Sequence, residues 1–406
     1  MIIFGTRPEA IKLAPLVLEM KRDGRGLEPV VCVTGQHRQM LDQILHWFSI
    51  TPDRDLDLMQ EDQSLSGFAG RALFSLSGVI RGEKPDAILV QGDTTTAMIA
   101  ALAGFYERIP VGHVEAGLRT GDLYNPFPEE MNRRVAGVVA SYHFAPTEQS
   151  AHALLAEGVA PDRIFIVGNT VLDALRLTMD RPIRLDKSCR PTNGRRLILV
   201  TAHRRESFGA PFESICHAIR NIAVGSESVE LIYPVHMNPN VREPVMRHLT
   251  GHPRIRLIEP LAYEQFVHLM SKCDLILTDS GGIQEEATAL RKPTLIMRNT
   301  TERSEAIRAG TAALVGTETE NIVQAAENLL RDKNAYRSMT KGECPFGDGH
   351  SAEHVLTILR ERLSSSVGEP GRKSTHLQWQ PWMAQQVSVA SEISSASLNG
   401  SFKRIE

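Results

Sequence analysis

Chemically versatile side chains follow directly after several short apolar runs in this 406-residue chain. Asp93 and Glu115 stand after two such runs in the first half, and His203 stands after a run in the second half. Carboxylates and imidazoles held beside buried strands can accept and return protons. Arg7, which follows the first apolar run, can bind two oxygens of a phosphate at once. These residues point to acid–base chemistry on an anionic ligand.

The segment Asp274–Ala287, DLILTDSGGIQEEA, predicts a strand, a Ser-Gly-Gly turn and a helix. The first N–H groups of such a helix lack an acceptor within it, and the helix dipole is positive at that end, so the junction suits a phosphate. Glu285 and Glu286 lie about one turn further on, within reach of sugar hydroxyls. This is the arrangement of a nucleotide diphosphate site. An ordinary strand-to-helix connection, with glycines for tight turning, is the alternative.

Two segments of the first half allow both a functional and a structural interpretation. In GTRPEAIK, Arg7 is suited to clamp phosphate oxygens, with Lys12 about one helical turn further on. The alternative is a solvated arginine at a helix start. In QGDTTT, Asp93 is either a functional carboxylate or the N-cap of a helix that begins with the threonines.

The next two segments are rich in acids. In HVEAGLRT, Glu115 follows a buried strand so closely that its carboxylate needs a partner or a function. In NPFPEEMNRR, Glu129 and Glu130 fall in the first turn of a helix, where they suit the helix dipole. Glu130 and Arg134 also form an i,i+4 pair, so structure alone explains this segment.

Basic residues dominate the corresponding places of the second half. In LILVTAHRRES, His203 is followed by Arg204 and Arg205 at a strand end, which suggests anion binding combined with proton transfer. In YPVHMNPN, His236 is similarly placed, with a structural role as the alternative to ligand binding.

Short apolar strands alternate with amphipathic stretches along the chain, which predicts an α/β fold with parallel sheets covered by helices on both faces. The strands expected in the first series are Ile2–Phe4, Val30–Thr34, Ala87–Val90, Val111–Val114 and Ile164–Val167. Those of the second series are Leu197–Val200, Glu230–Pro234, Ile255–Ile258, Leu275–Leu277 and Thr294–Met297. The clearest helical stretches are Ala10–Lys21, Leu65–Ile80, Ala97–Tyr106 and Ala352–Leu363.

The polar stretch Arg181–Arg195 looks like a linker between two Rossmann-like halves, with a cleft between them. We therefore expect an N-terminal Rossmann-like domain at 1–180 and a C-terminal one at 196–345. The segment after residue 363 is rich in Ser, Gly and Gln and has no sustained period, so 364–406 is expected to be a disordered tail. Its Trp379 and Trp382 are interpreted as incidental, with a partner anchor as the alternative.

Composition excludes several classes of protein. The formal charge of −3 gives no support to nucleic acid or an anionic membrane as a partner. The start of the chain lacks the features of a signal peptide, and no run of about 18 apolar residues predicts a membrane span, so a cytoplasmic protein is expected. The five cysteines are scattered and never spaced as CxxC. The sequence also lacks GxGxxG after a strand, GxxxxGK[ST] and HExxH, so no cofactor and no metal are expected.

Ten motifs, in order from residue 4 to about residue 360, together resemble the non-hydrolysing UDP-N-acetylglucosamine 2-epimerases of bacteria. They are FGTRPEAIK, QGDTTT, GHVEAGLRTGD, PFPEEMNRR, VGNTV, TAHRRESFG, YPVHMNPNVREPV, LTDSGGIQEEA, MRNTTER and PFGDG. The resemblance implies a two-domain fold of the glycosyltransferase-B type with its active site in the interdomain cleft. It also implies a homodimer, and a C-terminal helix at 346–363 that crosses back to the first domain.

The resemblance assigns roles to residues within these motifs. The implied catalytic residues are Asp93, Glu115, Glu129 and His203. The acids are candidates for proton transfer, and His203 is a candidate for shuttling a proton or stabilising the leaving diphosphate. The implied UDP-binding residues are Arg7, Lys12, Ser280, Gly281, Gly282 and, at the ribose, Glu286. A second site, where some bacterial members bind an activating substrate molecule, would comprise Gln36, Arg71, Arg204 and His236.

The family's reaction interconverts UDP-N-acetylglucosamine and UDP-N-acetylmannosamine through elimination of UDP to 2-acetamidoglucal. The resemblance therefore implies that activity, in the supply of N-acetylmannosamine units for a bacterial surface polysaccharide. Which acid serves which face of the sugar is left open. The rival functions are a glycosyltransferase of the same fold, a hydrolysing epimerase that releases free N-acetylmannosamine, and a nucleotide-sugar sensor without catalysis.

Overall fold

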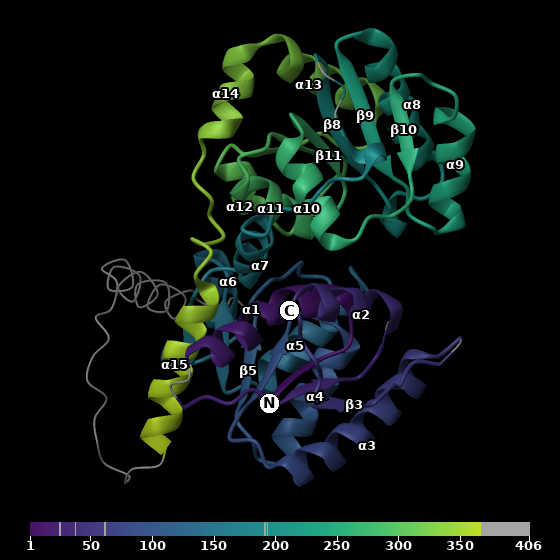
Figure 1. The fold of residues 1–406 in the computed structure, drawn as a ribbon. Coiled ribbons are helices and arrows are strands. Elements are labelled where there is room, and N and C mark those ends of the chain that lie inside the picture. Colours follow the sequence, from purple (N-terminus) through teal and green to yellow (C-terminus); the bar gives the residue numbers. More distant parts are fainter. Residues whose placement is uncertain (24–25, 37, 61, 191, 193, 367–406) are drawn as a thin grey trace, which may run out of the picture. The chain divides into compact units, whose positions relative to one another are not determined.

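The computed structural model describes residues 1–366 apart from 24–25, 37, 61, 191 and 193 (Figure 1). Residues 1–360 form one unit; the second unit, 361–406, is described only to the end of the last helix at Ser366. The tail predicted at 364–406, with Trp379 and Trp382, therefore lies almost wholly outside the described residues.

The first sheet has seven strands in the order β3-β2-β1-β4-β5-β6-β7, and each neighbouring pair is parallel. Its central strands are buried over their whole length, because helices cover both faces of the sheet. The strands are β1 Ile2–Phe4, β2 Val31–Val33, β3 Arg54–Asp55, β4 Ile88–Gln91, β5 Val111–Val114, β6 Tyr142–Ala145 and β7 Ile164–Ile166.

The second sheet has six strands in the order β10-β9-β8-β11-β12-β13, and it is also parallel throughout. The strands are β8 Arg196–Thr201, β9 Val229–Pro234, β10 Ile255–Ile258, β11 Leu275–Thr278, β12 Thr294–Ile296 and β13 Ala312–Leu314. Two doubly covered parallel sheets confirm the predicted α/β class and the two Rossmann-like halves.

Helices follow nearly every strand, as the crossover connections of a parallel sheet require. Those of the first half are α1 Arg7–Asp23, α2 Arg38–Trp47, α3 Leu65–Glu83, α4 Thr95–Tyr106, α5 Glu129–Val139, α6 Glu148–Ala156 and α7 Thr170–Met179. Those that follow are α8 Ala210–Gly225, α9 Pro239–Leu249, α10 Tyr263–Lys272, α11 Gly281–Ala289, α12 Ser304–Arg308, α13 Thr319–Arg331, α14 Lys333–Lys341 and α15 Ser351–Ser366. Three 3₁₀ turns are η1 Pro161–Arg163, η2 Lys187–Cys189 and η3 Arg205–Ser207.

Helix α15 begins against the first half, although it follows the second half in the sequence (Figure 1). Its first N–H groups, those of Ser351 and Ala352, donate to the Asp173 carboxylate of α7 at 3.1 and 2.9 Å. A carboxylate there satisfies donors that the helix itself cannot. The predicted return of the C-terminal helix is therefore confirmed, while the predicted domain limits at 180, 196, 345 and 363 stay a prediction.

The order of each sheet reverses at its centre, where β1 separates β2 from β4 and β8 separates β9 from β11. Ligands of open parallel sheets bind beyond the carboxyl ends of the strands at such points. Arg7 and Asp93 follow β1 and β4. His203 and Ser280 follow β8 and β11. The topology thus places four of the predicted site residues where ligands are expected.

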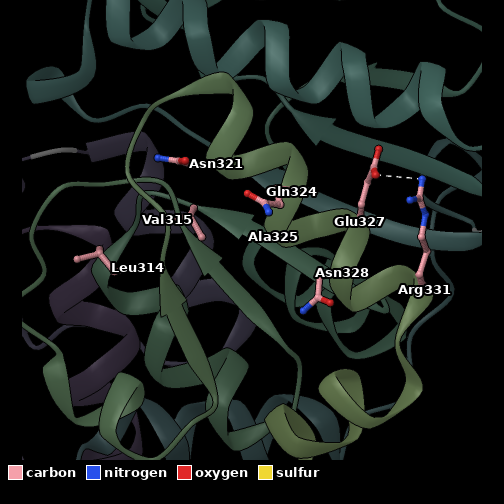
Figure 2. A pocket seen from close by; sticks show the side chains of 8 residues that line it. All are labelled: Leu314, Val315, Asn321, Gln324, Ala325, Glu327, Asn328 and Arg331. Carbon is pink, nitrogen blue, oxygen red and sulfur yellow. Dashed lines mark ion pairs between the residues drawn. The ribbon is translucent and has the colours of Figure 1, made fainter.

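A hollow of about 650 Å³ lies over strand β13 and helix α13 (Figure 2). Its walls are formed by Leu314, Val315, Asn321, Gln324, Ala325, Glu327, Asn328 and Arg331. Glu327 and Arg331 form an ion pair at 3.0 Å along one side. None of the residues predicted for the active site lines this hollow. Separately, no helix within the described part of the chain is long and apolar enough to cross a membrane.

Candidate active site

Glu115 is the centre of a buried polar network at the end of β5. Its backbone φ is 62°, in the left-handed region that residues other than glycine rarely adopt and that is frequent at functional sites. Its carboxylate accepts hydrogen bonds from Lys12 Nζ at 2.5 and 2.6 Å and from Asn169 Nδ2 at 3.2 Å, and a further one from Gln91 Nε2. The sequence indicated that this buried acid needs a partner or a function, and Lys12, Asn169 and Gln91 are its partners.

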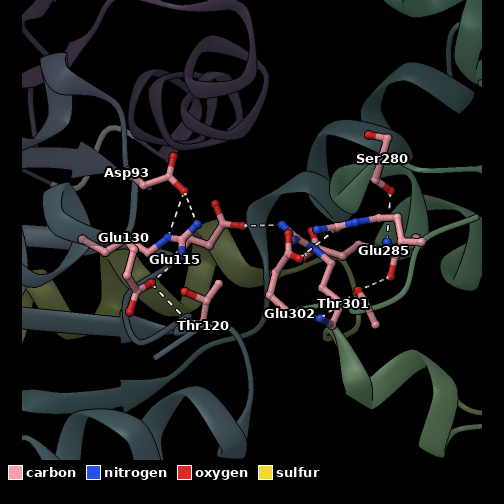
Figure 3. Close-up of polar contacts among 12 residues, drawn as sticks. Asp93, Glu115, Thr120, Glu130, Ser280, Glu285, Thr301 and Glu302 are labelled. Atoms are coloured by element: carbon pink, nitrogen blue, oxygen red, sulfur yellow. Dashed lines mark hydrogen bonds and ion pairs between the residues drawn. The ribbon is translucent and has the colours of Figure 1, made fainter. Parts of the chain in front are cut away.

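Arg303 connects this network to the second half of the molecule. The acids that it joins, Glu115 and Glu285, are labelled in Figure 3. Arg303 Nη2 lies 3.6 Å from Glu115 Oε1, and its Nε donates to Glu285 of α11 at 2.8 Å. Asn169 at the start of α7 donates to both carboxylates, at 3.2 Å to Glu115 and 2.9 Å to Glu285. Arg303 Nη1 also donates to Glu302 at 2.5 Å. Charged groups from both sheets thus meet at one place.

The charges in this network set which acid is ionised. Burial opposes ionisation of Glu115, but the positive charges of Lys12 and Arg303 outweigh it and lower the pKa of Glu115. Burial raises the pKa of Glu285, and Arg303 only partly offsets it. Glu115 is consequently the carboxylate that is held ionised and able to accept a proton.

Asp93 is paired, and it does not cap the helix that follows. Thr94 is the N-cap of α4, and its side chain accepts a hydrogen bond from the N–H of Ala97. The capping alternative for Asp93 is therefore wrong, because the helix starts one residue later than that alternative assumed. The Asp93 carboxylate instead meets Arg133 of α5, with Nε at 2.9 Å and Nη2 at 2.8 Å.

Arg133 also joins Glu130 to this group, through Nη1 at 2.9 Å. Glu130 is fully buried and pairs with Arg134 at 3.4 Å, as its i,i+4 spacing predicted. Glu129, the first residue of α5, differs from its neighbour because its Oε2 atom is buried and has no hydrogen-bond partner. A buried acceptor without a partner is rare, and it makes Glu129 a candidate for a role in the site.

His203 lies beside a second buried acid, Asp279, which the sequence analysis did not identify. Asp279 follows β11, and its Oδ2 accepts hydrogen bonds from the N–H groups of His203 and Arg204 at 2.7 and 2.8 Å. Its Oδ1 lies 3.8 Å from His203 Nδ1 and has no hydrogen-bond partner. Burial lowers the pKa of His203, against the opposing charge of Asp279, so the imidazole is neutral near pH 7.

No hydrogen bond or ion pair within the described part of the chain joins His203 to Asp93, Glu115 or Glu129. The structure therefore brings Asp93 together with Arg133 and Glu130, and Glu115 together with Lys12 and Glu285. His203 forms a separate group with Asp279 and stacks on His236, with ring centroids 5.2 Å apart and 13° between the planes.

The junction between β11 and α11 differs in detail from the predicted Ser-Gly-Gly turn. Asp279 and Ser280 make the connection, and Gly281 is already the first helical residue. A Cβ atom on Gly281 would lie 2.4 Å from Arg303 Nη1, whereas one on Gly282 would have nothing within 4 Å. Gly281 is thus needed for the close approach of Arg303, and tight turning does not explain it. The N–H groups of this first helical turn suit an anion, as predicted.

Arg7 and Glu286 approach the same region from the two halves. Arg7 begins α1, and its charge and that of Glu286 influence each other. Glu286 is buried and accepts a hydrogen bond from the Tyr263 hydroxyl at 2.9 Å. Burial raises the pKa of Glu286 to about 7. A carboxyl group with this pKa can either donate or accept a hydrogen bond at neutral pH.

The four residues predicted for a second substrate site are not joined to one another by hydrogen bonds or ion pairs within the described residues. Gln36 accepts from Thr96 Oγ1 at 2.8 Å, and Arg71 donates to Gln63 Oε1 at 2.8 Å. Arg204 is bonded through its backbone to Asp279, and His236 Nδ1 accepts from the N–H of Asn238 at 3.1 Å.

Several residues of the site were not identified from the sequence. Asn169 and Arg303 lie within VGNTV and MRNTTER, but an amide and an arginine in loops gave no separate signal. Gln91, Arg133 and Asp279 sit one or a few residues from predicted positions. A buried Glu115 needs a positively charged partner, so the basic residues of the chain could have been considered for that role. Nothing in the sequence shows which of them pairs with Glu115.

Known proteins resemble this chain over most of its length. Residues 19–360 match a family described as UDP-N-acetylglucosamine 2-epimerase. The enzyme of that name from Escherichia coli is 53% identical over 371 residues, which cover 89% of this chain and 98% of the relative. The one from Yersinia pestis is 54% identical over 367 residues, which cover 88% of this chain and 97% of the relative.

A solved structure is similar over the same range. The UDP-GlcNAc 2-epimerase from Neisseria meningitidis, bound to UDP-GlcNAc, is 44% identical with a TM-score of 0.84, and the match covers 89% of this chain and 99% of that chain. A family match over most of the chain and relatives more than half identical over nearly their whole length lead to one conclusion. The chain belongs to the UDP-N-acetylglucosamine 2-epimerase family, and is an isomerase of that family.

Proposed function

We propose that this protein interconverts UDP-N-acetylglucosamine and UDP-N-acetylmannosamine by eliminating and re-adding UDP. A base removes the proton from C2 of the sugar while the bond between C1 and the diphosphate oxygen breaks. This leaves 2-acetamidoglucal, with a C1–C2 double bond, and free UDP. UDP then attacks C1 again, and a proton is delivered to the other face of C2, which inverts that centre.

The observation that carries this proposal is the network around Glu115. The reaction needs a carboxylate that is ionised before the substrate arrives, and Lys12 and Arg303 lower the pKa of Glu115 to that end. The same two cations would stabilise negative charge that builds up nearby as the bond to UDP breaks. A glycosyltransferase of the same fold would need an acceptor site, and it would not need acids at Asp93, Glu115 and Glu129 together.

Two further acids are available for the opposite face of the sugar. Glu129 has a buried oxygen with no hydrogen-bond partner among the described residues, and Asp93 is held through its Oδ2 by two nitrogens of Arg133. We propose that Asp93, Glu115 and Glu129 share the proton transfers, without assigning one acid to one face.

The diphosphate is proposed to lie at the first turn of α11, at Ser280, Gly281 and Gly282. Free N–H groups and the positive helix end favour an anion there. Arg7 would hold phosphate oxygens from the other half, and Glu286 would bind the ribose. Neutral His203, supported by Asp279, is suited to take up a proton as the leaving diphosphate is stabilised.

Incubation with UDP-N-acetylglucosamine in heavy water, followed by NMR, tests the reaction. We expect UDP-N-acetylmannosamine to appear, with deuterium at C2 of both epimers, because the C2 proton exchanges with solvent during elimination. Substrate without label and without the epimer after prolonged incubation would rule the proposal out. Release of free N-acetylmannosamine would identify a hydrolysing epimerase, and binding without turnover would identify a sensor.

The setting of the activity is part of the same proposal. We propose a cytoplasmic homodimer that supplies N-acetylmannosamine units for a bacterial surface polysaccharide. The support is the likeness to bacterial relatives such as that of Escherichia coli. Light scattering of the full chain at several concentrations tests the dimer, and a monomer throughout would contradict it.

A further inference from the structure

Three side chains of types that bind transition metals come together on the surface of the second half. Glu213 and His217 belong to α8, and His248 belongs to α9. One ligand atom from each lies within 4.8 Å of the other two. This group could not be identified from the sequence, because its third member stands 31 residues after His217 and on another helix.

The two helices fix the positions of these side chains. Glu213 and His217 are four residues apart on α8, so they project from the same face of the helix. Helix α9 packs beside α8 through buried Val245 and Leu249 (Figure 1). Arg220 of α8 also donates to the carbonyl oxygen of His248 at 2.7 Å. Ligands carried by packed helices are held in place before an ion arrives.

The carboxylate of Glu213 is oriented by a second contact. Its Oε1 accepts from Arg247 Nη1 at 3.0 Å, which leaves Oε2 directed at His248 Nε2. The rings of His217 and His248 have centroids 4.6 Å apart and are tilted by 59°. Metal-bound carboxylates are typically held by such an additional hydrogen bond. Two imidazoles and one carboxylate oxygen therefore converge, with the carboxylate already fixed.

We propose that Glu213, His217 and His248 form a binding site for a divalent transition-metal ion, with Zn²⁺ as the preferred ion. Two imidazoles with one carboxylate match zinc, whereas Mg²⁺ and Ca²⁺ prefer oxygen ligands throughout. Two ligand atoms that share a tetrahedral zinc ion are roughly 3.4 Å apart, since each is about 2.1 Å from it. Rotation of these surface side chains closes the remaining difference, and solvent takes the fourth position.

His217 distinguishes this site from an ordinary polar cluster. An ion pair of Glu213 with Arg247 and a hydrogen bond to His248 form a complete group without any metal. His217 takes no part in those two contacts, but it is required as the third ligand of an ion. Replacing His217 therefore removes metal binding and leaves the polar cluster intact.

Calorimetric titration of the full chain, free of any polyhistidine tag, with Zn²⁺ alone at pH 7.5 tests the proposal. We expect one equivalent to bind, and His217→Ala and His248→Ala each to weaken binding at least about tenfold. His46→Ala, which removes another exposed histidine on α2, is the matched control and leaves binding unchanged. Binding weakens at pH 5.5, because an imidazole binds metal only in its neutral form.

The same titration separates this site from the stacked pair of His203 and His236. The bound equivalent persists in His236→Ala under the proposal. Loss of the equivalent in His236→Ala, full binding in His217→Ala, or no binding by the unaltered chain would each overturn it. Epimerase turnover stays within about twofold in His217→Ala, since the site is remote from the network around Glu115. Failure of the zinc proposal therefore leaves the proposed reaction untouched.

Discussion

Glu115 and Asp279 are both buried acids that directly follow a parallel strand, β5 in the first sheet and β11 in the second, but their surroundings differ. Glu115 is bonded to Lys12 and lies close to Arg303, so its charge is neutralised by cations. Asp279 receives two backbone N–H groups and keeps one oxygen without a hydrogen-bond partner, 3.8 Å from His203.

This difference separates two tasks. Around Glu115 the cations fix the charge of the acid, so its ionisation depends little on pH near neutrality. Beside Asp279 the neighbouring imidazole can gain or lose a proton with little rearrangement, because Asp279 is anchored through its other oxygen. Under the proposed reaction, one region holds a fixed base and the other lets a proton move.

Glu115→Gln breaks the first region most directly. Loss of the base lowers kcat by about a thousandfold or more, within the range for a positioned acid–base group. Deuterium exchange at C2 is lost in parallel, while UDP still binds. The folded state is less stable by about 3–5 kcal/mol, because the buried Lys12 ammonium loses its charged partner, whereas Arg303 keeps Glu285 and Glu302.

Glu157→Gln is the matched control for that variant. Glu157 forms two hydrogen bonds with Arg119, at 2.8 and 2.7 Å, without belonging to the network. Its turnover stays within about twofold of the unaltered chain, since a surface pair contributes little. More than a tenth of normal turnover in Glu115→Gln would remove Glu115 from the proton transfers.

His203→Asn breaks the second region. The amide keeps a polar group near Asp279 but cannot carry the proton, so kcat falls by about a hundredfold. Because His203 is partly exposed and its backbone N–H is unchanged, thermal stability changes little. Rapid-quench measurement of free UDP distinguishes slow bond breaking from slow release. Normal kcat in a folded His203→Asn would assign the imidazole a structural role only.

Gly281→Ala and Gly282→Ala test how the regions meet. A Cβ at residue 281 would collide with Arg303, so Gly281→Ala loses about 1–3 kcal/mol of stability in urea unfolding. A Cβ at residue 282 meets nothing within 4 Å, so Gly282→Ala keeps its stability and instead weakens UDP binding by crowding the proposed phosphate site. Equal stability losses in the two variants would contradict this interpretation.

The sheets were predictable because strand burial leaves near-continuous apolar runs, and every predicted strand matches an observed one within a residue at either end. Three strands were not predicted. β3 has only two residues, both exposed, and β6 carries Tyr142 and His143, which lack the apolar pattern. β13 is a short edge strand that ends at half-exposed Leu314.

The site was predictable one residue at a time, since strand ends can be read locally. The pairings were not, because they join residues far apart in the chain. Lys12 and Glu115 are 103 residues apart, and Asn169 and Glu285 are 116 apart. Both pairs depend on how the crossovers and the two sheets are assembled. The close approach of Arg303 to Gly281 could not be predicted locally either, since Arg303 is distant from it in sequence.

Mild acid gives the smallest expected effect and acts on the two regions differently. His113 and His143 face each other in the register of β5 and β6, beneath the network around Glu115. Burial lowers the pKa of His113 to about 4 and that of His143 to about 3. The unfolded chain binds these protons below about pH 6.5, so stability present above that pH is lost as the pH falls.

His143→Gln removes one of these titrations while keeping a polar side chain of similar size. Between pH 7.5 and 5.5 the unaltered chain loses about 1.4 kcal/mol more stability than His143→Gln. This is the energy of one pH unit, because pH 5.5 lies about one unit below the pKa of histidine in the unfolded chain. Urea unfolding at the two pH values measures this difference. Burial also lowers the pKa of His203, but its protonation would lower turnover without unfolding, because that imidazole is partly exposed and already accompanied by Asp279. An equal loss of stability in both chains would show that acid does not act through His143. The difference between the regions around Glu115 and Asp279 would then depend on the site residues alone.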